Sequence, residues 1–425
     1  MSLNFRLLAF LMLPLAPLVA QQNTEPYEFK TVYTLEATPV KDQGKTNACW
    51  AYSTTSMLES ELIRLSKGKR DLSALYLMRC MYREKCYNYV RRQGGSSLNG
   101  GAGLAHDVLN AVRRYGVVPT AAYPGTRGDA VPDHSQLEKT LDGMCSNFAQ
   151  RAKIGKLGSA WMQDIDRVFD DFFGPVPQKF SAEGKEFTPQ SYRDYLGILP
   201  EEYISLTSFT HHPFYEPFNL EIPDNWAGGI YYNLPLNDLL RCLNYSIQQG
   251  YSVVWDGDVS NPGLDRVKGL GIVPEKALKD KTEAEIKQNF VNWEPEQKIT
   301  PELRQTAFDR VETTDDHLMH ITGILDETHS GLYYVLKNSW GADSGREGML
   351  YLSDAYMRLN TVSLLINKNA LPEDVQKRLG FKAGEVMVPY KKGTQSEPAK
   401  VNMQNIKPSE LQNKKAIKDK AKEKQ

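Results

Sequence analysis

The spacing of apolar residues predicts that the first half of the chain is mostly helical. From Trp50 to Leu65, apolar side chains recur every three or four residues, as they do along one face of an α-helix. The same spacing predicts helices in LSALYLMRCMYREKCYNYV and in GLAHDVLNAVRRYG, the second of which ends before Pro119. Further on, FTPQSYRDYLG and LPLNDLLRCLNYSIQQGY are also predicted to be helical.

Apolar runs later in the chain predict β-strands instead. YSVVWDGDV, HLMHITGIL, GLYYVLKNSW and GMLYLSD are short, rich in β-branched and aromatic residues, and bounded by polar or glycine positions. One extended segment, YEFKTVYTLEATPVKDQG, precedes the first helix. Because helices come mostly early and strands late, the pattern indicates an α+β architecture.

The two ends of the chain differ from the rest. Residues 1–20 have Arg6, an apolar run from Leu7 to Val19, and the small residue Ala20, which is typical of a secretory signal peptide. We therefore expect export to a periplasm or the cell exterior, a retained membrane anchor being the alternative. Residues 391–425 carry ten lysines against four acids and few large apolar residues, which predicts a disordered tail or a short solvated helix. The folded domain is thus expected over residues 21–390.

Charge and cysteine content narrow the function classes. The formal net charge is −1, so no general attraction to nucleic acid or acidic membranes is expected. The five cysteines are an odd number, which leaves at least one thiol free or paired with another chain. Cys80 and Cys86 are about 9 Å apart along a predicted helix, on different faces, which argues against a disulfide between them.

Cys49 lies where the loop KDQGKTNA becomes the first predicted helix. A helix N-terminus and a nearby imidazolium both lower the pKa of a thiol, which makes it a better nucleophile. On position alone, a core cysteine and a catalytic one are equally compatible with Cys49. His317 and His320 open one predicted strand and point to opposite faces, so we expect only one of them to face Cys49.

Two further residues complete a candidate catalytic set. Asn338, in KNSWG, has a side-chain carbonyl that can accept an imidazole N–H, and Trp340 can shield that bond from water. Gln43, six residues before Cys49, can join the Cys49 backbone N–H in stabilising an oxyanion. No HExxH or paired Cys-x-x-Cys appears and His106, His211 and His212 are scattered, so no metal or other cofactor is expected.

The segments DQGKTNACWAYS, HLMHITGIL and KNSWG together resemble the papain-like cysteine peptidases. In that family the histidine begins a strand and a glycine follows six residues later, which His317 and Gly323 fit and His320 does not. His320 is therefore expected to pack in the strand or lie at the surface. Thr46-Asn47-Ala48 replaces the Cys-Gly-Ser that usually precedes the cysteine of the papain-like peptidases. Over residues 28–390, the segments GGAGLAHDVLNAVRRYGVVP, FTPQSYRDYLG, YSVVWDGDVS and LPEDVQKRL resemble the bleomycin hydrolase and aminopeptidase C branch.

The resemblance implies a two-lobed papain-like fold with insertions and peptide substrates bound between the lobes. Cys49 is then the nucleophile, His317 the general base, Asn338 its orienting partner and Gln43 an oxyanion donor. Gly100, Gly101 and Trp340 are expected to contribute to substrate binding. The branch also implies aminopeptidase activity and a possible homo-hexamer. Endopeptidase or dipeptide-releasing activity is the alternative within the class, and a catalytically idle binding protein the alternative outside it.

Two acidic residues immediately precede the candidate histidine. Asp315 and Asp316 can tune the pKa of His317, or they can simply lie in a solvated turn. We expect the turn, because runs of charge are usually solvated.

Overall fold

The structure is a computed structural model that describes residues 25–98, 100–126 and 131–381. The predicted signal peptide and the lysine-rich tail lie outside the described residues. No helix in the described ranges is both long enough and apolar enough to cross a membrane.

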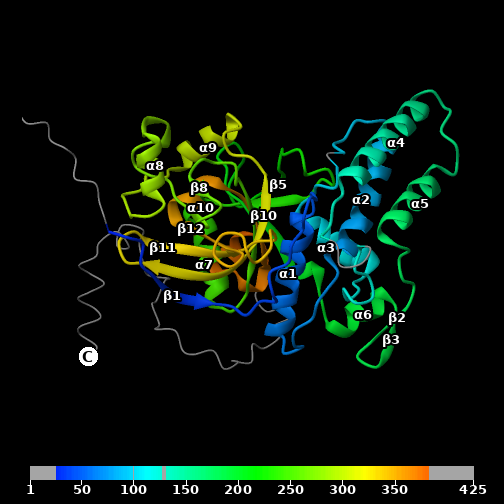
Figure 1. Cartoon of the computed structure of the whole chain (residues 1–425), viewed down its shortest axis with the longest axis horizontal. Helices are drawn as coiled ribbons and strands as arrows, with labels where there is room; N and C mark the ends of the chain where they lie inside the picture. Colours follow the sequence, from blue (N-terminus) through cyan, green and yellow to red (C-terminus); the bar gives the residue numbers. More distant parts are fainter. Residues whose placement is uncertain (1–24, 99, 127–130, 382–425) are drawn as a thin grey trace, which may run out of the picture.

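The helices that the sequence predicts are present, and several more accompany them. The α-helices are α1 (Cys49–Arg64), α2 (Ala74–Arg91), α3 (Ala105–Tyr115), α4 (Ser135–Lys153), α5 (Trp161–Phe173), α6 (Pro189–Leu196), α7 (Leu236–Gln248), α8 (Glu283–Asn289), α9 (Pro301–Asp309), α10 (Asp354–Asn360) and α11 (Glu373–Arg378). Short 3-10 turns occur at Pro200–Glu202, Leu278–Asp280 and Lys368–Ala370. Helices α1 to α5 follow one another with only loops between them and form the helical half of the molecule (Figure 1).

The strands form one large sheet and one small hairpin. They are β1 (Phe29–Thr34), β2 (Phe180–Ala182), β3 (Lys185–Phe187), β4 (Tyr203–Thr207), β5 (Pro217–Asn219), β6 (Ile230–Asn233), β7 (Val253–Gly257), β8 (Leu264–Asp265), β9 (Leu270–Gly271), β10 (His317–Glu327), β11 (Gly331–Lys337), β12 (Met349–Ser353) and β13 (Thr361–Asn367). The large sheet has the order β5-β6-β4-β13-β7-β10-β11-β12-β9-β8, with β1 paired to the far part of β10, while β2 and β3 pair with each other.

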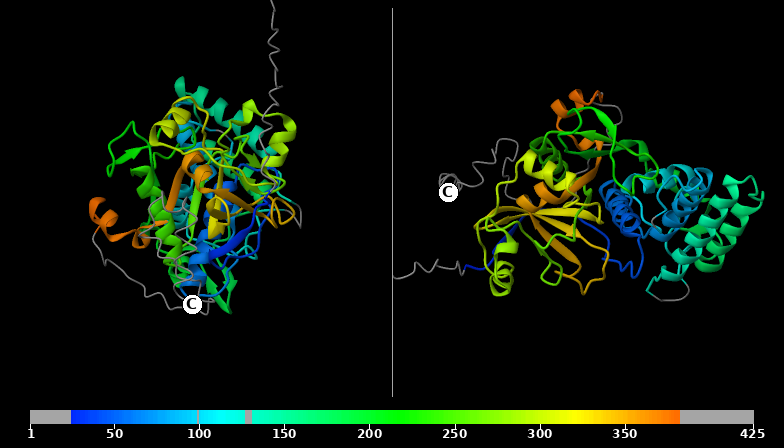
Figure 2. Two further views of the ribbon diagram at one scale, coloured as in Figure 1. Left: turned by 90° about the vertical axis from the view of Figure 1, so that its left-hand side faces the viewer. Right: turned by 90° about the horizontal axis from the view of Figure 1, so that it is seen from above.

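Helix α1 lies between the helical half and the sheet, as two perpendicular views show (Figures 1 and 2). It packs against β10 on one side and against α2 and α3 on the other. Most of its side chains are buried as a result, including polar ones such as Thr54 and Glu59. The first residue of α1 is thereby held against the first residues of β10.

Strand β10 separates two hydrophobic cores. Leu318 belongs to the core that contains α1 to α5, whereas Met319 belongs to the core of the β half, packed under α7. Successive side chains of a strand alternate between the two faces of its sheet, so this arrangement follows from the apolar run in the sequence. The α+β architecture that the sequence predicts is confirmed.

Candidate active site

Cys49 is the first residue of α1, as the sequence predicts. The preceding residue, Ala48, provides no side-chain cap, and the first turn carries no acidic residue. The Cys49 sulfur accepts hydrogen bonds from the backbone N–H groups of Trp50 and Leu318, which favour the thiolate. Burial outweighs them and raises the pKa of the Cys49 thiol to about 12. The raised pKa favours the thiol over the thiolate in the absence of substrate.

His317, the first residue of β10, is held by Asn338. The ring Nε2 donates to the Asn338 Oδ1 over 2.8 Å, in a buried environment. The backbone N–H of Ser339 donates to the same oxygen over 2.7 Å, which fixes the amide orientation. Because Nε2 carries the proton, the neutral ring presents Nδ1 as its acceptor. Burial lowers the pKa of His317 to about 4, against the opposing effect of the bond to Asn338.

Trp340 covers the histidine. Its ring centroid lies 4.6 Å from that of His317, with an angle of 31° between the rings. The Arg266 guanidinium lies 5.2 Å from the Trp340 centroid, in the range of a cation–π contact. Trp340 therefore occupies the shielding position that the sequence analysis gives it.

Gln43 is hydrogen-bonded to the loop that carries Asn338. Its backbone N–H donates to the Ser339 carbonyl, and its Oε1 accepts from the Ser339 hydroxyl over 2.6 Å. Its Nε2 donates to the Thr46 carbonyl over 2.9 Å, which uses one of its two N–H bonds. The Ser339 and Thr46 contacts are missing from the sequence analysis. Their only signal in the sequence is their position within the two motifs.

Cys49 and His317 come together through the strand backbone. Leu318, whose N–H contacts the sulfur, directly follows His317. Among the described residues no hydrogen bond joins the sulfur to the imidazole. Catalytic hydrogen bonds are often long or absent without substrate, and the site is compatible with closure of this contact on binding. Four residues from three separate segments are thus assembled around the start of α1.

Gly100 and Gly101 are both buried, and Gly101 contacts Trp50, the residue that follows Cys49. The Gly101 carbonyl accepts from the Trp50 indole over 3.0 Å, and its N–H donates to the Glu138 carboxylate. A Cβ at Gly100, whose φ is +50°, would lie 2.9 Å from the Glu138 carboxyl group. Gly101 thus finds its hydrogen bonds inside the protein in this structure, and a role for either glycine in substrate binding stays a prediction.

His320 packs inside the protein, one of the two placements expected for it. It is fully buried, and its Nδ1 is 2.9 Å from the Ser56 hydroxyl of α1.

The prediction of a solvated turn fits Asp316, which is exposed, but is wrong for Asp315. Asp315 is half-buried and has one carboxylate oxygen without a hydrogen-bond partner among the described residues. The reason is tertiary: the loop around Asp224 covers it, and its carboxylate accepts a backbone N–H from that residue.

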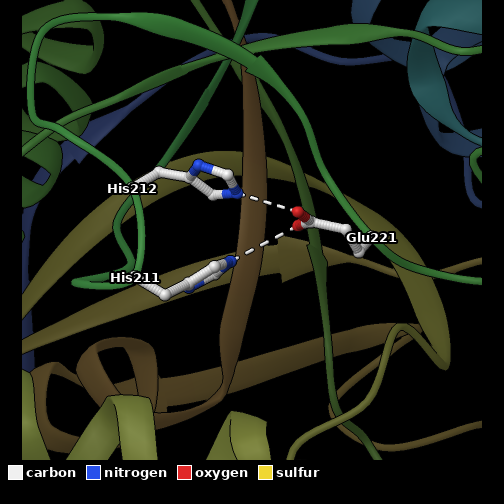
Figure 3. Close-up of side chains that lie close together, drawn as sticks. All are labelled: His211, His212 and Glu221. Carbon is white, nitrogen blue, oxygen red and sulfur yellow. Dashed lines mark hydrogen bonds and ion pairs between the residues drawn. The ribbon is translucent and has the colours of Figure 1, made fainter.

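A second cluster lies in the segment that follows β4. Figure 3 shows His211 and His212 pointing at Glu221, with Nε2–oxygen distances of 3.3 and 2.8 Å. The two histidines and Glu221 are therefore not scattered, and their ligand atoms lie within 4.8 Å of one another, close enough to hold a metal ion.

The hydrogen bonds of Gln305 bear on metal binding at this cluster. Its Nε2 donates to the Asp309 carboxylate and to His211 Nδ1, over 2.7 and 3.0 Å. Its Oε1 accepts the Thr210 N–H. Flipping the Gln305 amide would therefore break the hydrogen bonds to Thr210 and Asp309. The neutral His211 ring then carries its proton on Nε2, the atom that a metal would require. The cluster is better suited to an imidazole–carboxylate pair.

The arrangement defines a papain-like fold with a thiol, an imidazole and an amide at one site. A family model described as the Peptidase C1-like family matches residues 99–388. The chain belongs to the Peptidase C1-like family.

Individual relatives extend the comparison. The chain is 26% identical over 296 residues to Aminopeptidase C of Lactobacillus delbrueckii subsp. lactis. The aligned region covers 63% of this chain and 62% of that protein. It is 22% identical over 396 residues to bleomycin hydrolase of Mus musculus, covering 82% and 84% of the two chains. The crystal structure of pepw from Lactobacillus rhamnosis shares the fold at a TM-score of 0.64 and 18% identity, covering 83% of this chain and 84% of that chain.

Proposed function

We propose that the chain hydrolyses peptide bonds with Cys49 as its nucleophile. The observation that carries the proposal is the buried hydrogen bond from His317 to Asn338. His317 directly precedes Leu318, whose backbone N–H contacts the Cys49 sulfur. A histidine fixed in this tautomer next to a thiol is the arrangement that nucleophilic catalysis by cysteine requires. Membership in the Peptidase C1-like family supports the same reaction class.

The proposed reaction begins when substrate brings Nδ1 of His317 to the sulfur. Nδ1 takes the thiol proton while the sulfur attacks the peptide carbonyl carbon, and the carbonyl oxygen becomes an oxyanion. The Cys49 backbone N–H and the second Nε2–H bond of Gln43 are its donors. His317 then gives its proton to the leaving amine. Water, deprotonated by the same ring, hydrolyses the thioester and restores the thiol.

The proposed specificity is removal of residues from the N-terminus of peptides. It is supported by relatives named aminopeptidase C and aminopeptidase G, at 26% and 22% identity. Comparing an aminoacyl fluorogenic amide with its N-acetylated form tests it. Turnover of the free-amine form alone is expected, and equal turnover of both would assign an endopeptidase.

Alkylation with iodoacetamide separates a peptidase from an idle fold. We expect modification of Cys49 to abolish turnover, and to become slower in His317→Ala. Cys242 is a built-in control, since it is buried on α7 in the other core and should stay unmodified while the protein is folded. If Cys49 is modified at the same rate in the wild type and in His317→Ala, and no peptide is turned over, the chain is a binding protein instead.

Export and assembly are proposals as well. The N-terminal pattern supports export, and recovery of the protein from the cytosol with Met1 in place would refute it. The resemblance to the bleomycin hydrolase branch supports a hexamer, which light scattering of the purified chain tests directly.

A further inference from the structure

A carboxylate lies on the sheet face that meets the start of α1. Asp256 of β7 is directly opposite Leu318 of β10 and Ser363 of β13. Residues directly opposite in antiparallel strands share a face, and Leu318 faces the core that contains α1. Asp256 therefore points to the same side as Leu318, whose N–H contacts the Cys49 sulfur.

Asp256 is buried without a full set of partners. The residue is 2% exposed, and its Oδ2 accepts from the Ser363 hydroxyl over 3.1 Å. Its Oδ1 has no hydrogen-bond partner among the described residues. Asp258, two residues on, makes a contrast: it accepts the backbone N–H groups of Ser260, Asn261 and Thr314. A buried oxygen left unbonded is costly, so Asp256 calls for a donor that the described part of the chain does not supply.

The neighbours of Asp256 are also acidic. The strongest charge effects on it come from Asp315, Asp224 and Asp316, all carboxylates. Asp315 has an unbonded oxygen of its own, while Tyr231, from β6, faces the same carboxylates. We call Asp224, Asp256 and Asp315 the acidic cluster. Burial and the other carboxylates raise the pKa of Asp256 well above its usual range, and burial and Asp224 raise that of Asp315 to about 7.

The acidic cluster is next to the nucleophile. Asp256 and Asp224 both raise the pKa of the Cys49 thiol by repelling its thiolate. Asp224 and Asp315 are half-buried, so the cluster also reaches the surface. A group bound there would thus lie beside the bond that Cys49 attacks.

We propose that the acidic cluster binds the ammonium group of the peptide substrate, an inference that rests on the proposed peptidase function. An ammonium has three N–H donors and one positive charge, which match the carboxylate oxygens of Asp256 and Asp315 that have no hydrogen-bond partner among the described residues. The ammonium comes from the peptide's own N-terminus or from a lysine side chain. The chain thus supplies from its sheet the anionic partner that selects a charged amine.

The test uses three reporter amides: alanyl, N-acetylalanyl and N-acetyl-lysyl-alanyl. Asp256→Asn keeps the shape of the side chain but cannot become negatively charged, and Asp315→Asn is the second variant. Asp326→Asn is the matched control, a partly buried aspartate at the far end of β10. We expect Asp256→Asn to lower kcat/KM about ten- to a hundredfold for the alanyl amide, the usual effect of losing one buried charged hydrogen bond. The residual turnover of N-acetylalanyl amide, which carries no ammonium and is expected to be a poor substrate, should stay within about twofold of the wild-type rate.

Each result decides the proposal. Selective loss with alanyl amide assigns the cluster to the N-terminus, and selective loss with the lysyl substrate assigns it to a side chain. Equal loss on all three substrates, or none in either variant, would overturn it. If the wild type cleaves no peptide, the proposed function fails separately. Calorimetry with alaninamide then decides, because binding that Asp256→Asn abolishes supports the cluster and binding unaffected by it does not.

Discussion

Replacing Asn338 with alanine removes the acceptor that holds His317. Two buried donors then lose their partner, the His317 Nε2–H and the Ser339 N–H. Each unmade buried hydrogen bond costs about 1–3 kcal/mol. Only the first acts on the reaction, because it fixes which nitrogen carries the proton. If the transition state loses about 1–3 kcal/mol of stabilisation in this way, kcat/KM falls about five- to 150-fold.

The assay is kcat/KM on an aminoacyl fluorogenic amide, with urea unfolding measured on the same preparations. Asn244→Ala is the matched control, because Asn244 Oδ1 accepts the Tyr334 hydroxyl over 2.9 Å in the β half. Asn244→Ala should lose stability by about 1 kcal/mol and keep its activity within about twofold. The orienting role assigned to Asn338 would be wrong if Asn338→Ala kept its activity, or if both variants lost activity equally.

Three further predictions concern neighbouring residues. Gln43→Glu puts an oxygen where Nε2 donates, so kcat should fall about a hundredfold or more with little change in KM; near-normal kcat would exclude Gln43 as an oxyanion donor. Trp340→Ala uncovers His317, and the ring pKa measured by NMR should rise from about 4 toward 6.5; an unchanged value would mean that Trp340 is not the source of burial. Burial lowers the pKa of Lys337 to about 8, so the unfolded chain binds the extra proton above that pH. The free energy of unfolding should therefore rise between about pH 8 and 10 by up to about 1.4 kcal/mol per pH unit, but not in Lys337→Met, and parallel curves would contradict this.

The sequence is most informative where structure is local. A helix that begins at Cys49 and a strand that begins at His317 follow from periodicity, and both are confirmed. The helices α4 and α5 are missing from the sequence analysis, although Leu137, Leu141 and Cys145, and then Ile165 and Phe169, recur four residues apart. Their signal is present in the pattern, but the many aromatic residues around them hide it.

Tertiary pairing is what the sequence analysis could not supply. Asp256 is in a strand predicted to be buried, yet its proximity to Asp315 depends on β7 pairing with β10. The same holds for Ser339 and Gln43, which are 296 positions apart and share a hydrogen bond. A motif shows which residue types recur together. It does not show which polar atoms remain without partners once the chain has folded.

The acidic cluster leads to a final prediction in which two measurements move in opposite directions. Asp256 repels the Cys49 thiolate, so Asp256→Asn should lower the pKa of the thiol. Alkylation of Cys49 should then be faster, by up to about tenfold for each pKa unit, wherever Asp256 is ionised in the wild type. Over the same range, turnover of the free-amine substrate should fall because the ammonium loses its partner. General damage to the site would slow both reactions together, so a parallel decrease would refute electrostatic coupling between Asp256 and Cys49.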